Sequence, residues 1–252
     1  MLARIALLLL AGLKYSKFGG TLVTMLISVG AYALVFGWRY AVGIVAMLFL
    51  HEMGHYIAAV RRGMRVRLPM FIPFAFAWVT LEDMPHDAET EAYIGLAGPM
   101  LGSVAAIGAY FLARDSGSQW LLAVAYTGFF INLVNLIPLP PLDGGRVTAV
   151  LSPRVWLLGV PIIGALLFYR FSVILALVAI MAVPHVIAAL RFNPQDSAVA
   201  RYYSGISPRV RWEYGFLYIG LIAFLAYMTN DVNDELHHRQ RPQVEDTQVD
   251  NV

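Results

Sequence analysis

The chain has 252 residues, of which 59% are hydrophobic and only 13% charged, and its mean hydropathy is +0.66. Soluble domains contain roughly 45–50% apolar residues, so this composition excludes an ordinary soluble fold and indicates a membrane protein. The formal net charge of +2 is too small to suggest nucleic-acid binding. Cysteine is absent from the sequence, which excludes disulfides and cysteine-ligated zinc, so any metal must be held by His, Asp or Glu.

Residues 1–18 contain Arg4 close to their start and then a short apolar stretch, and we expect them to form an interfacial or partly inserted segment. A bilayer-spanning helix needs about 20 apolar residues. Segments that meet this requirement, at least approximately, are residues 20–37, 40–60, 91–113, 119–137, 155–169, 171–191 and 213–229. The pair at 155–191 is the least regular, because Arg170 interrupts it and two prolines allow kinks; it can be a tight hairpin or one broken element.

Between the second and third spans, residues 65–82 are rich in β-formers and prolines and predict a β-hairpin near the membrane surface. The expected fold class is therefore an α-helical polytopic membrane protein with about six to seven transmembrane helices and a small membrane-proximal hairpin. Two parts are expected: an intramembrane core at 1–195, and a C-terminal extension at 196–252 that contains the helix at 213–229 and a polar, disordered tail after residue 230.

The basic residues predict the orientation of these spans, since cytosolic loops carry an excess of Lys and Arg. One side of the predicted topology holds most of them: Lys14, Lys17, Arg61, Arg62, Arg65, Arg67, Arg146, Arg154, Arg191, Arg201, Arg209 and Arg211. The other side holds Arg39, Arg114 and Arg170. We expect a multi-pass protein of the cell membrane whose functional site opens toward the cytosol.

The second predicted span contains the stretch "FLHEMGHYIAA", residues 49 to 59, where two histidines and a glutamate interrupt an apolar run. On a helix, positions i and i+4 share one face, so His51 and His55 project together and Glu52 lies on the flank. Two imidazoles on one face suit a zinc ion, and an adjacent carboxylate can move a proton during hydrolysis. The alternative, a buried polar network without metal, stays open at this point.

A catalytic zinc needs a third protein ligand. Glu89 and Glu91 lie in a charged stretch where a solvated loop or helix start explains them better. Asp143 follows three prolines and precedes two glycines in "NLVNLIPLPPLDGGRVTAV", so it sits where a span breaks and must line a cavity or pack against protein. An aspartate in such a partly dry place favours a metal ion as its partner. Capping of the following helix, or pairing with Arg146, stays open as the simpler alternative.

The order of these motifs resembles the site-2 protease family of intramembrane zinc metalloproteases, peptidase family M50. "HEMGH" lies on an early span, "NLIPLPPLDGG" on a later one, and "AGPMLGS" at 97–103 resembles the Gly-Pro segment that this family carries between them. The resemblance covers roughly residues 20 to 191 and corresponds to a compact form, without a PDZ-like module between the motifs.

This resemblance implies one zinc ion per chain held by His51, His55 and Asp143, with Glu52 as the general base. It also implies that Asn135 holds the substrate backbone or the developing oxyanion. The expected activity is hydrolysis of peptide bonds within or next to a transmembrane segment, as in regulated intramembrane proteolysis, and the expected partners are a membrane-protein substrate and the lipid bilayer, not nucleic acid. An exposed strand edge within 65–82 can receive the unwound substrate as an added strand.

Other functions compete with this one. A membrane zinc protease with a distant glutamate as third ligand shares the first motif but not the segment from Asn135 to Gly145. A transporter of metal ions would be favoured by internal repeats, and we find none. A scaffold without activity fits poorly, because every residue that the chemistry requires is present.

Overall fold

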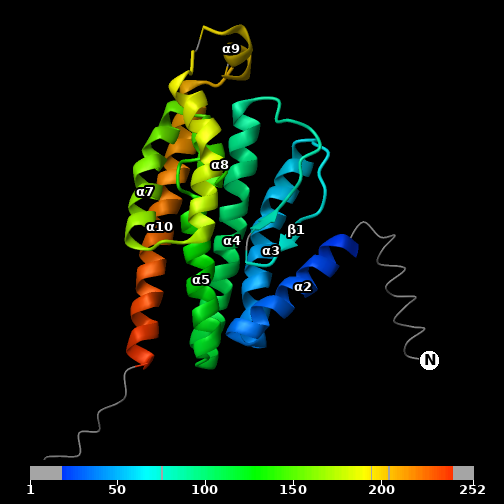
Figure 1. Ribbon diagram of the computed structural model, residues 1–252, viewed down its shortest axis with the longest axis vertical. Coiled ribbons are helices and arrows are strands. Elements are labelled where there is room, and N and C mark those ends of the chain that lie inside the picture. The colour runs from blue at the N-terminus through cyan, green and yellow to red at the C-terminus, as the bar shows by residue number, and fades with distance from the viewer. Residues whose placement is uncertain (1–18, 75, 194, 204, 241–252) are drawn as a thin grey trace, which may run out of the picture.

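The computed structural model describes residues 19–74, 76–193, 195–203 and 205–240, and it is mostly helical (Figure 1). In chain order the described elements are α2 (Gly19–Phe36), α3 (Trp38–Arg61), β1 (Met70–Ile72), β2 (Phe76–Trp78), α4 (Ala88–Ser116), α5 (Gln119–Asn135), α6 (Asp143–Ala149), the 3₁₀ helix η1 (Pro153–Leu158), α7 (Gly159–Tyr169), α8 (Val173–Leu190), α9 (Ser197–Tyr203) and α10 (Pro208–Gln240). The predicted segment 1–18 lies outside the described residues.

Five of these helices are long and apolar enough to cross a membrane: α2, α3, α4, α8 and α10. Helix α5 is 17 residues long, and residues 153–169 form a shorter apolar helical stretch. The polytopic helical architecture expected from composition is therefore supported. The number of six to seven transmembrane helices stays a prediction.

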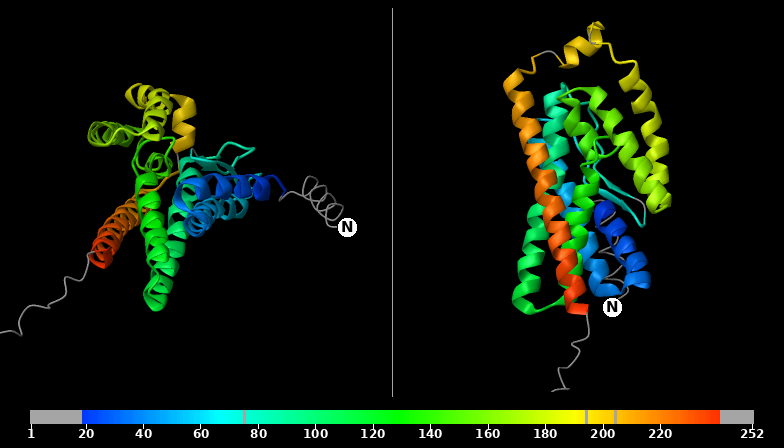
Figure 2. Two further views of the ribbon diagram at one scale, coloured as in Figure 1. Left: turned by 60° about the horizontal axis from the view of Figure 1, so that its bottom comes forward. Right: turned by 90° about the vertical axis from the view of Figure 1, so that its left-hand side faces the viewer.

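Helices α3, α4, α5 and α10 run roughly alongside one another and form the centre of the molecule (Figures 1 and 2). Their facing apolar side chains build the largest buried cluster, in which Leu122, Phe129 and Leu225 are fully buried. Burial of such side chains contributes about 1.5–3 kcal/mol each relative to an aqueous environment. Because lipid is also apolar, close packing and hydrogen bonds between helices matter more here than in a soluble core.

Local sequence explains where the central helices begin and end. The Asp87 side chain accepts a hydrogen bond from the backbone N–H of Thr90 (2.6 Å) and caps α4. Gly117 ends α4 in the left-handed conformation, with φ of 66°, which costs glycine little. Ser118 then caps α5 through Leu121 N–H, so α4 and α5 form an antiparallel hairpin.

The irregular pair of segments at 155–191 forms two separate helices rather than one broken element. Pro161 lies in the first turn of α7, where a missing N–H costs no helical hydrogen bond, and Arg170 follows the last residue of that helix. Pro184 is accommodated inside α8. The two helices lie outside the central bundle and expose many apolar side chains (Figure 2).

The predicted hairpin is present as β1 and β2, which pair antiparallel with Met70 opposite Trp78 and Ile72 opposite Phe76. Two ion pairs close its base, Arg65–Asp83 and Arg67–Glu82, each 2.7 Å long. Hydrogen bonds from the Arg65 side chain lower the pKa of Asp83 to about 2, so this carboxylate stays charged at neutral pH.

Helix α10 extends further than the sequence predicts. We expected disorder after residue 230, but α10 continues to Gln240. Val232 is fully buried in the central cluster, and Leu236 is partly buried against it. At the end of the helix, the Arg239 side chain donates to the Gly117 carbonyl (3.5 Å). Polar residues alone suggested a tail, whereas packing against α5 and the α4–α5 turn stabilises the helix.

Candidate metal centre

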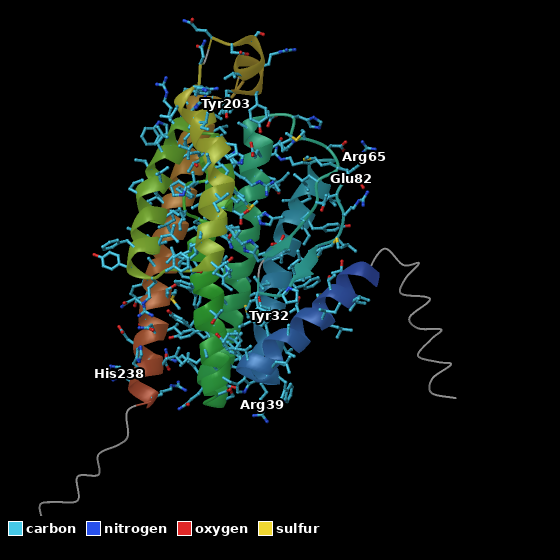
Figure 3. All side chains as sticks on the ribbon, in the orientation of Figure 1. Tyr32, Arg39, Arg65, Glu82, Tyr203 and His238 are labelled. Atoms are coloured by element: carbon cyan, nitrogen blue, oxygen red, sulfur yellow. The ribbon has the colours of Figure 1, made fainter. Side chains whose placement is uncertain are left out.

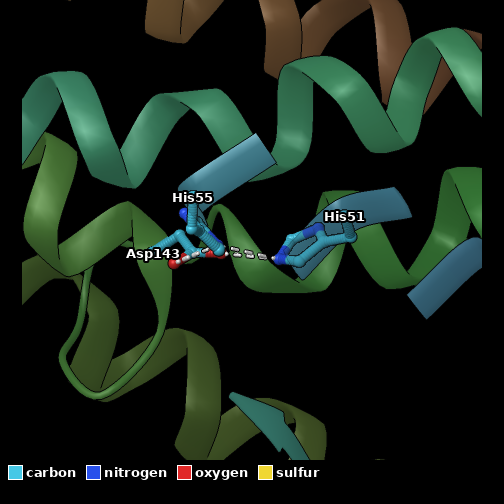
Figure 4. A group of neighbouring side chains, drawn as sticks. All are labelled: His51, His55 and Asp143. Atoms are coloured by element: carbon cyan, nitrogen blue, oxygen red, sulfur yellow. Dashed lines mark hydrogen bonds and ion pairs between the residues drawn. The ribbon is translucent and has the colours of Figure 1, made fainter. Parts of the chain in front are cut away.

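Three side chains from two elements meet inside the central bundle (Figure 4). His51 and His55 lie one turn apart on α3, and Asp143 is the first residue of α6. Their exposed fractions are 3%, 4% and 7%, so all three are buried. The i, i+4 spacing places the two imidazoles on one face of α3, as the sequence predicts.

The distances between their polar atoms suit a single cation. The Nε2 atoms of His51 and His55 lie 3.1 Å apart. Asp143 Oδ2 lies 3.1 Å from His51 Nε2, and Asp143 Oδ1 lies 3.2 Å from His55 Nε2. A tetrahedral zinc with bonds of roughly 2.0–2.1 Å separates its ligand atoms by about 3.3 Å. The group therefore has the dimensions of a three-ligand zinc site.

Hydrogen bonds on the far side of each ring determine which nitrogen carries the proton. His55 Nδ1 lies 2.7 Å from the Ile94 carbonyl oxygen, which can only accept, so Nδ1–H donates. His51 Nδ1 lies 2.8 Å from Asn132 Oδ1. The orientation of this amide follows from its other end, because Asn132 Nδ2 donates to the Gly128 carbonyl (2.7 Å). Each neutral histidine is therefore protonated at Nδ1.

Both Nε2 atoms consequently present lone pairs to each other and to a carboxylate. Lone pairs at 3.1 Å in a buried site repel unless a cation or added protons lie between them. Histidines that bind metal ions commonly donate their other N–H to a carbonyl or carboxylate in this way. The donor set of two imidazoles and one carboxylate, with no sulfur, can hold zinc.

Glycines on α4 let this helix approach the site closely. A Cβ added at Gly98 would lie 2.2 Å from His55 Nε2, and one at Gly102 would lie 2.3 Å from Asn132 Oδ1. On the opposing helix, a Cβ at Gly54 would lie 2.2 Å from the Ala97 carbonyl oxygen. The glycines on this face of α4 therefore make room for the site itself.

The loop between α5 and α6 folds back closely onto its own backbone at the two glycines in the first turn of α6. A Cβ at Gly144 would meet the Leu136 carbonyl at 2.2 Å, and one at Gly145 would meet the Pro140 nitrogen at 2.2 Å. The predicted break between the proline-rich stretch and the paired glycines is thus present, and the reversal brings Asp143 to α3. Two donors from other elements hold its ends: Tyr218 O–H to the Leu136 carbonyl (2.5 Å) and Trp156 Nε1–H to the Gly145 carbonyl (2.8 Å).

Glu52 lies beside His51 in α3 and is buried, with an exposed fraction of 6%. His51, His55 and Asp143 are close enough to interact with its charge, and so is Arg146. Across the described ranges, no hydrogen bond or ion pair engages the Glu52 carboxylate. A buried carboxylate next to the group of ligands, with its oxygens uncommitted, is available for proton transfer.

The structure finds a polar contact that the sequence reasoning missed. Asn132, one turn before Asn135, bonds to His51 and is 2% exposed. Asn135 is the last residue of α5 and partly exposed, and within the described residues no hydrogen bond connects it to the three grouped side chains. A signal was present in the sequence, since Asn132 is a polar residue near the end of an otherwise apolar helical stretch.

The rejected ligand candidates have other contacts. Glu89 pairs with Arg62 (3.4 Å), and Glu91 accepts a hydrogen bond from the Tyr202 hydroxyl. Asp143 does begin a helix, and it lies 3.9 Å from Arg146 Nη1. The simpler explanations of Asp143 are therefore compatible with its place in the group, since its two oxygens still face the imidazoles.

A buried His-His-Asp group beside a free carboxylate, inside a bundle of apolar helices, is typical of membrane metalloproteases. Comparison with known proteins agrees with this class: residues 39–117 match the sequence profile of peptidase family M50. This segment, which holds both histidines and Glu52, is therefore similar to the family that the motifs resemble.

Two curated relatives are named as a zinc metalloprotease and a probable zinc metalloprotease. The chain is 28% identical over 111 residues to a zinc metalloprotease of Methanocaldococcus jannaschii, which covers 42% of this chain and 32% of that protein. It is 32% identical over 94 residues to a probable chloroplastic zinc metalloprotease of Arabidopsis thaliana, which covers 33% of this chain and 17% of that protein. The matched region therefore spans about a third or less of these relatives' length.

Proposed function

We propose that this protein is an intramembrane zinc endopeptidase that hydrolyses peptide bonds within or next to a transmembrane segment of a membrane-protein substrate. The observation that carries the proposal is the convergence of His51, His55 and Asp143, whose ligand atoms all lie within 4.8 Å of one another. Helices long and apolar enough to cross a membrane surround this group. The family match and the names of the two relatives support the same activity.

In this proposal the three side chains are the ligands of one zinc ion per chain. Zinc held there supplies Lewis acidity for a carbonyl group and for water. The Nδ1–H bonds to Ile94 and Asn132 keep both Nε2 lone pairs directed at the ion. Two neutral imidazoles and one carboxylate would neutralise part of the charge of such an ion and so lower the cost of burying it.

Glu52 is the general base of the proposed reaction. Its buried carboxylate accepts a proton from the attacking water and later delivers a proton to the leaving amine. Asn135 is the proposed hydrogen-bonding group for the substrate backbone or the developing oxyanion. Its place at the end of α5, eight residues before Asp143, puts it where the spanning helix breaks and side-chain amides can reach an extended peptide.

A helical substrate must unwind before its carbonyl groups can be attacked, and each unsatisfied amide in lipid costs several kcal/mol. The hairpin β1–β2 supplies a partner, because each strand pairs with only one neighbour among the described residues. Strand β1 also contacts α2, and Phe71 N–H donates to the Thr24 hydroxyl (3.3 Å). An added substrate strand would replace the hydrogen bonds lost on unwinding.

We further propose that the hairpin end of the molecule faces the cytosol and that the protein lies in the cell membrane. Arg65, Glu82 and Tyr203 lie toward one end of the bundle, while Arg39 and His238 lie toward the other (Figure 3). The arginine-rich loops gather at the hairpin end, as expected for a cytosolic face.

The substitution Glu52→Gln tests this mechanism, because it removes the base and keeps the shape of the side chain. We expect zinc content near that of the wild type and a loss of cleavage of roughly 10²–10⁴-fold. Both are measured on the full chain reconstituted in vesicles with a model transmembrane substrate.

Glu213→Gln is the matched control, since it makes the same chemical change on the exposed surface of α10 and should leave cleavage unchanged. Unimpaired cleavage by the Glu52→Gln protein would refute the mechanism.

A further inference from the structure

Two hollows follow one another along the same pair of helical segments, away from the metal centre. The first, of about 320 Å³, lies between α7 and α8 and is lined by apolar side chains and one glycine, among them Val160, Ile163, Gly164, Val183 and Ile187. Its wall also includes Leu139 from the loop that leads to Asp143. This hollow has the chemistry of a hydrocarbon-binding groove.

The second hollow, of about 250 Å³, is amphipathic. Trp156 and Phe192 supply apolar walls, while Arg191, Asn193, Asp196 and Tyr203 supply polar groups. Arg154 stands beside it, with its guanidinium 5.9 Å from the Phe192 ring centre. Among the described residues, no ion pair involves Arg154 or Arg191, so both guanidinium groups are available to an anion.

Helical spacing aligns the two hollows. Ile187 and Arg191 are i and i+4 along the end of α8, so Arg191 lies one turn beyond Ile187 on the same face. Trp156 and Val160 are likewise four residues apart where η1 runs into α7. The apolar groove therefore leads toward the arginine-bearing pocket.

The polar hollow lies at the end of the membrane-spanning helices. Arg191 follows the last residue of α8, and Tyr203 ends α9, which lies at the top of the molecule in Figure 1. A phospholipid at a cytosolic surface has its phosphate at this depth and its acyl chains below. The order of the two hollows matches the order of these two parts.

We propose that the two hollows form one phospholipid site, with the lipid phosphate bound by Arg191 and Arg154 and an acyl chain in the groove between α7 and α8. Guanidinium groups bind phosphate oxygens through charge-assisted hydrogen bonds. Asp196 lies in the same pocket and would repel a free anion more than a headgroup that also carries donors. The shared chemistry is a phosphate monoanion, and the attached hydrocarbon distinguishes a lipid from a soluble phosphate.

A lipid bound there would contact both sides of the metal-binding loop. Leu139 lines the apolar groove, four residues before Asp143. Trp156 lines the polar pocket and donates to the carbonyl of Gly145, two residues after Asp143. The proposed lipid is therefore a structural ligand of the segment that carries Asp143, and its binding can be measured without any cleavage assay.

The test uses the full chain in a maltoside detergent, which contains no phosphate, and a phosphatidylglycerol with a photoactivatable acyl chain. We expect crosslinks to map to the facing residues of α7 and α8. Arg191→Gln should lower the yield about fivefold, as expected for one arginine near a lipid phosphate. Gly164→Leu should also lower the yield, because open space surrounds a Cβ at this position and the larger side chain fills the groove.

Two matched controls make the same chemical changes elsewhere. Arg170→Gln removes an exposed charge at the other end of α7, and Gly220→Leu adds the same side chain on α10, where a Cβ also meets open space. Both should crosslink like the wild type.

Further probes identify the source of the phosphate and the occupant. The proposal predicts weak labelling by a diacylglycerol that carries the same photoactivatable chain but no phosphate, and little competition by inorganic phosphate. Equal labelling of the wild type, Arg191→Gln and Gly164→Leu would overturn the site. Full competition by inorganic phosphate would assign the polar pocket to a soluble ligand. Displacement of the lipid probe by a model transmembrane substrate would assign the apolar groove to the substrate helix. Either result would contradict the proposal.

Discussion

Two hydrogen bonds at the Nδ1 atoms of His51 and His55 determine the protonation of the histidine pair. The carbonyl of Ile94 and the amide oxygen of Asn132 each accept from an Nδ1–H group, so both Nε2 atoms are left without protons. A pair of imidazoles without these acceptors would shift between tautomers and bind a metal ion less well. The identity of residue 132 therefore matters to the site almost as much as the ligands do.

Replacing Asn132 with alanine should weaken zinc binding while the helices stay folded. The change removes the acceptor for His51, and loss of such a partner typically costs about 10–100-fold in metal affinity. Competition with a chromogenic chelator measures the affinity. Asn135→Ala, one turn further along α5, is the control and should keep its zinc. Equal affinities in Asn132→Ala and the wild type would show that this hydrogen bond does not orient His51.

At the scale of the elements, the site depends on how closely α4 packs against α3 and α5. Glycines on one face of α4 allow the His55 ring and the Asn132 amide to lie almost against its backbone. Pro99 lies in the same stretch of α4 and is buried. Small residues at helix interfaces are common in membrane proteins, but here the space they leave is filled by polar side chains of the site.

Gly98→Ala should disrupt the site without unfolding the bundle. The added methyl group would lie 2.2 Å from His55 Nε2, so the ring must turn away from its ligand position. We expect zinc affinity to fall by more than about tenfold, comparable with loss of a group that orients a ligand. Gly108→Ala is the matched control on the same helix, because a Cβ there meets nothing within 4 Å.

Chelator competition and circular dichroism should be measured on both α4 variants. Unchanged helicity in both, with zinc loss only in Gly98→Ala, is the expected result. If Gly98→Ala binds zinc normally, the close approach of α4 is not required for the geometry of His55.

At this scale, some features of the site could be predicted from the sequence and others could not. The paired motifs predicted which residues gather at the site, because the i, i+4 spacing of the histidines and the broken helix before Asp143 are local features. The contact between His51 and Asn132 joins residues 81 positions apart, and no local pattern determines it. Its only sequence signal was an amide side chain at position 132, within an apolar stretch of α5.

Helix α10 shows a different kind of failure. The charges after residue 230 predicted a disordered tail, and this was wrong as far as Gln240. Leu221, Leu225, Val232 and Leu236 recur at spacings of four and seven and pack on α5 in one stripe. Counting this stripe instead of the overall polarity would have extended the helix.

At the scale of the whole molecule, α10 packs in the same core as α3, α4 and α5. It packs along α5, and the Tyr218 hydroxyl bonds to the Leu136 carbonyl at the start of the loop that leads to Asp143. The Arg211 side chain donates to the carbonyls of Val150 and Leu151 at the end of α6. These contacts join α10 to the loop and helix that carry Asp143, and the division of the chain near residue 195 stays a prediction.

The orientation in the membrane can be tested on the same scale, because the chain contains no cysteine. Met84, which is 85% exposed, precedes α4 near the hairpin, and the exposed Ser116 lies at the other end of this helix. We expect a membrane-impermeant thiol reagent to label Met84→Cys only from the cytosolic side and Ser116→Cys only from the outside. The reverse pattern would invert the proposed orientation.

The central claim is that His51, His55 and Asp143 together hold one zinc ion. The most direct measurement is the zinc content of the purified full chain beside three variants: His51→Ala, Asp143→Ala and, as a carboxylate control, Glu213→Ala. The account predicts one zinc per chain in the wild type and in Glu213→Ala, and loss of zinc in the other two, since each removes one of three protein ligands. Stoichiometric zinc retained at wild-type affinity in both His51→Ala and Asp143→Ala would contradict it.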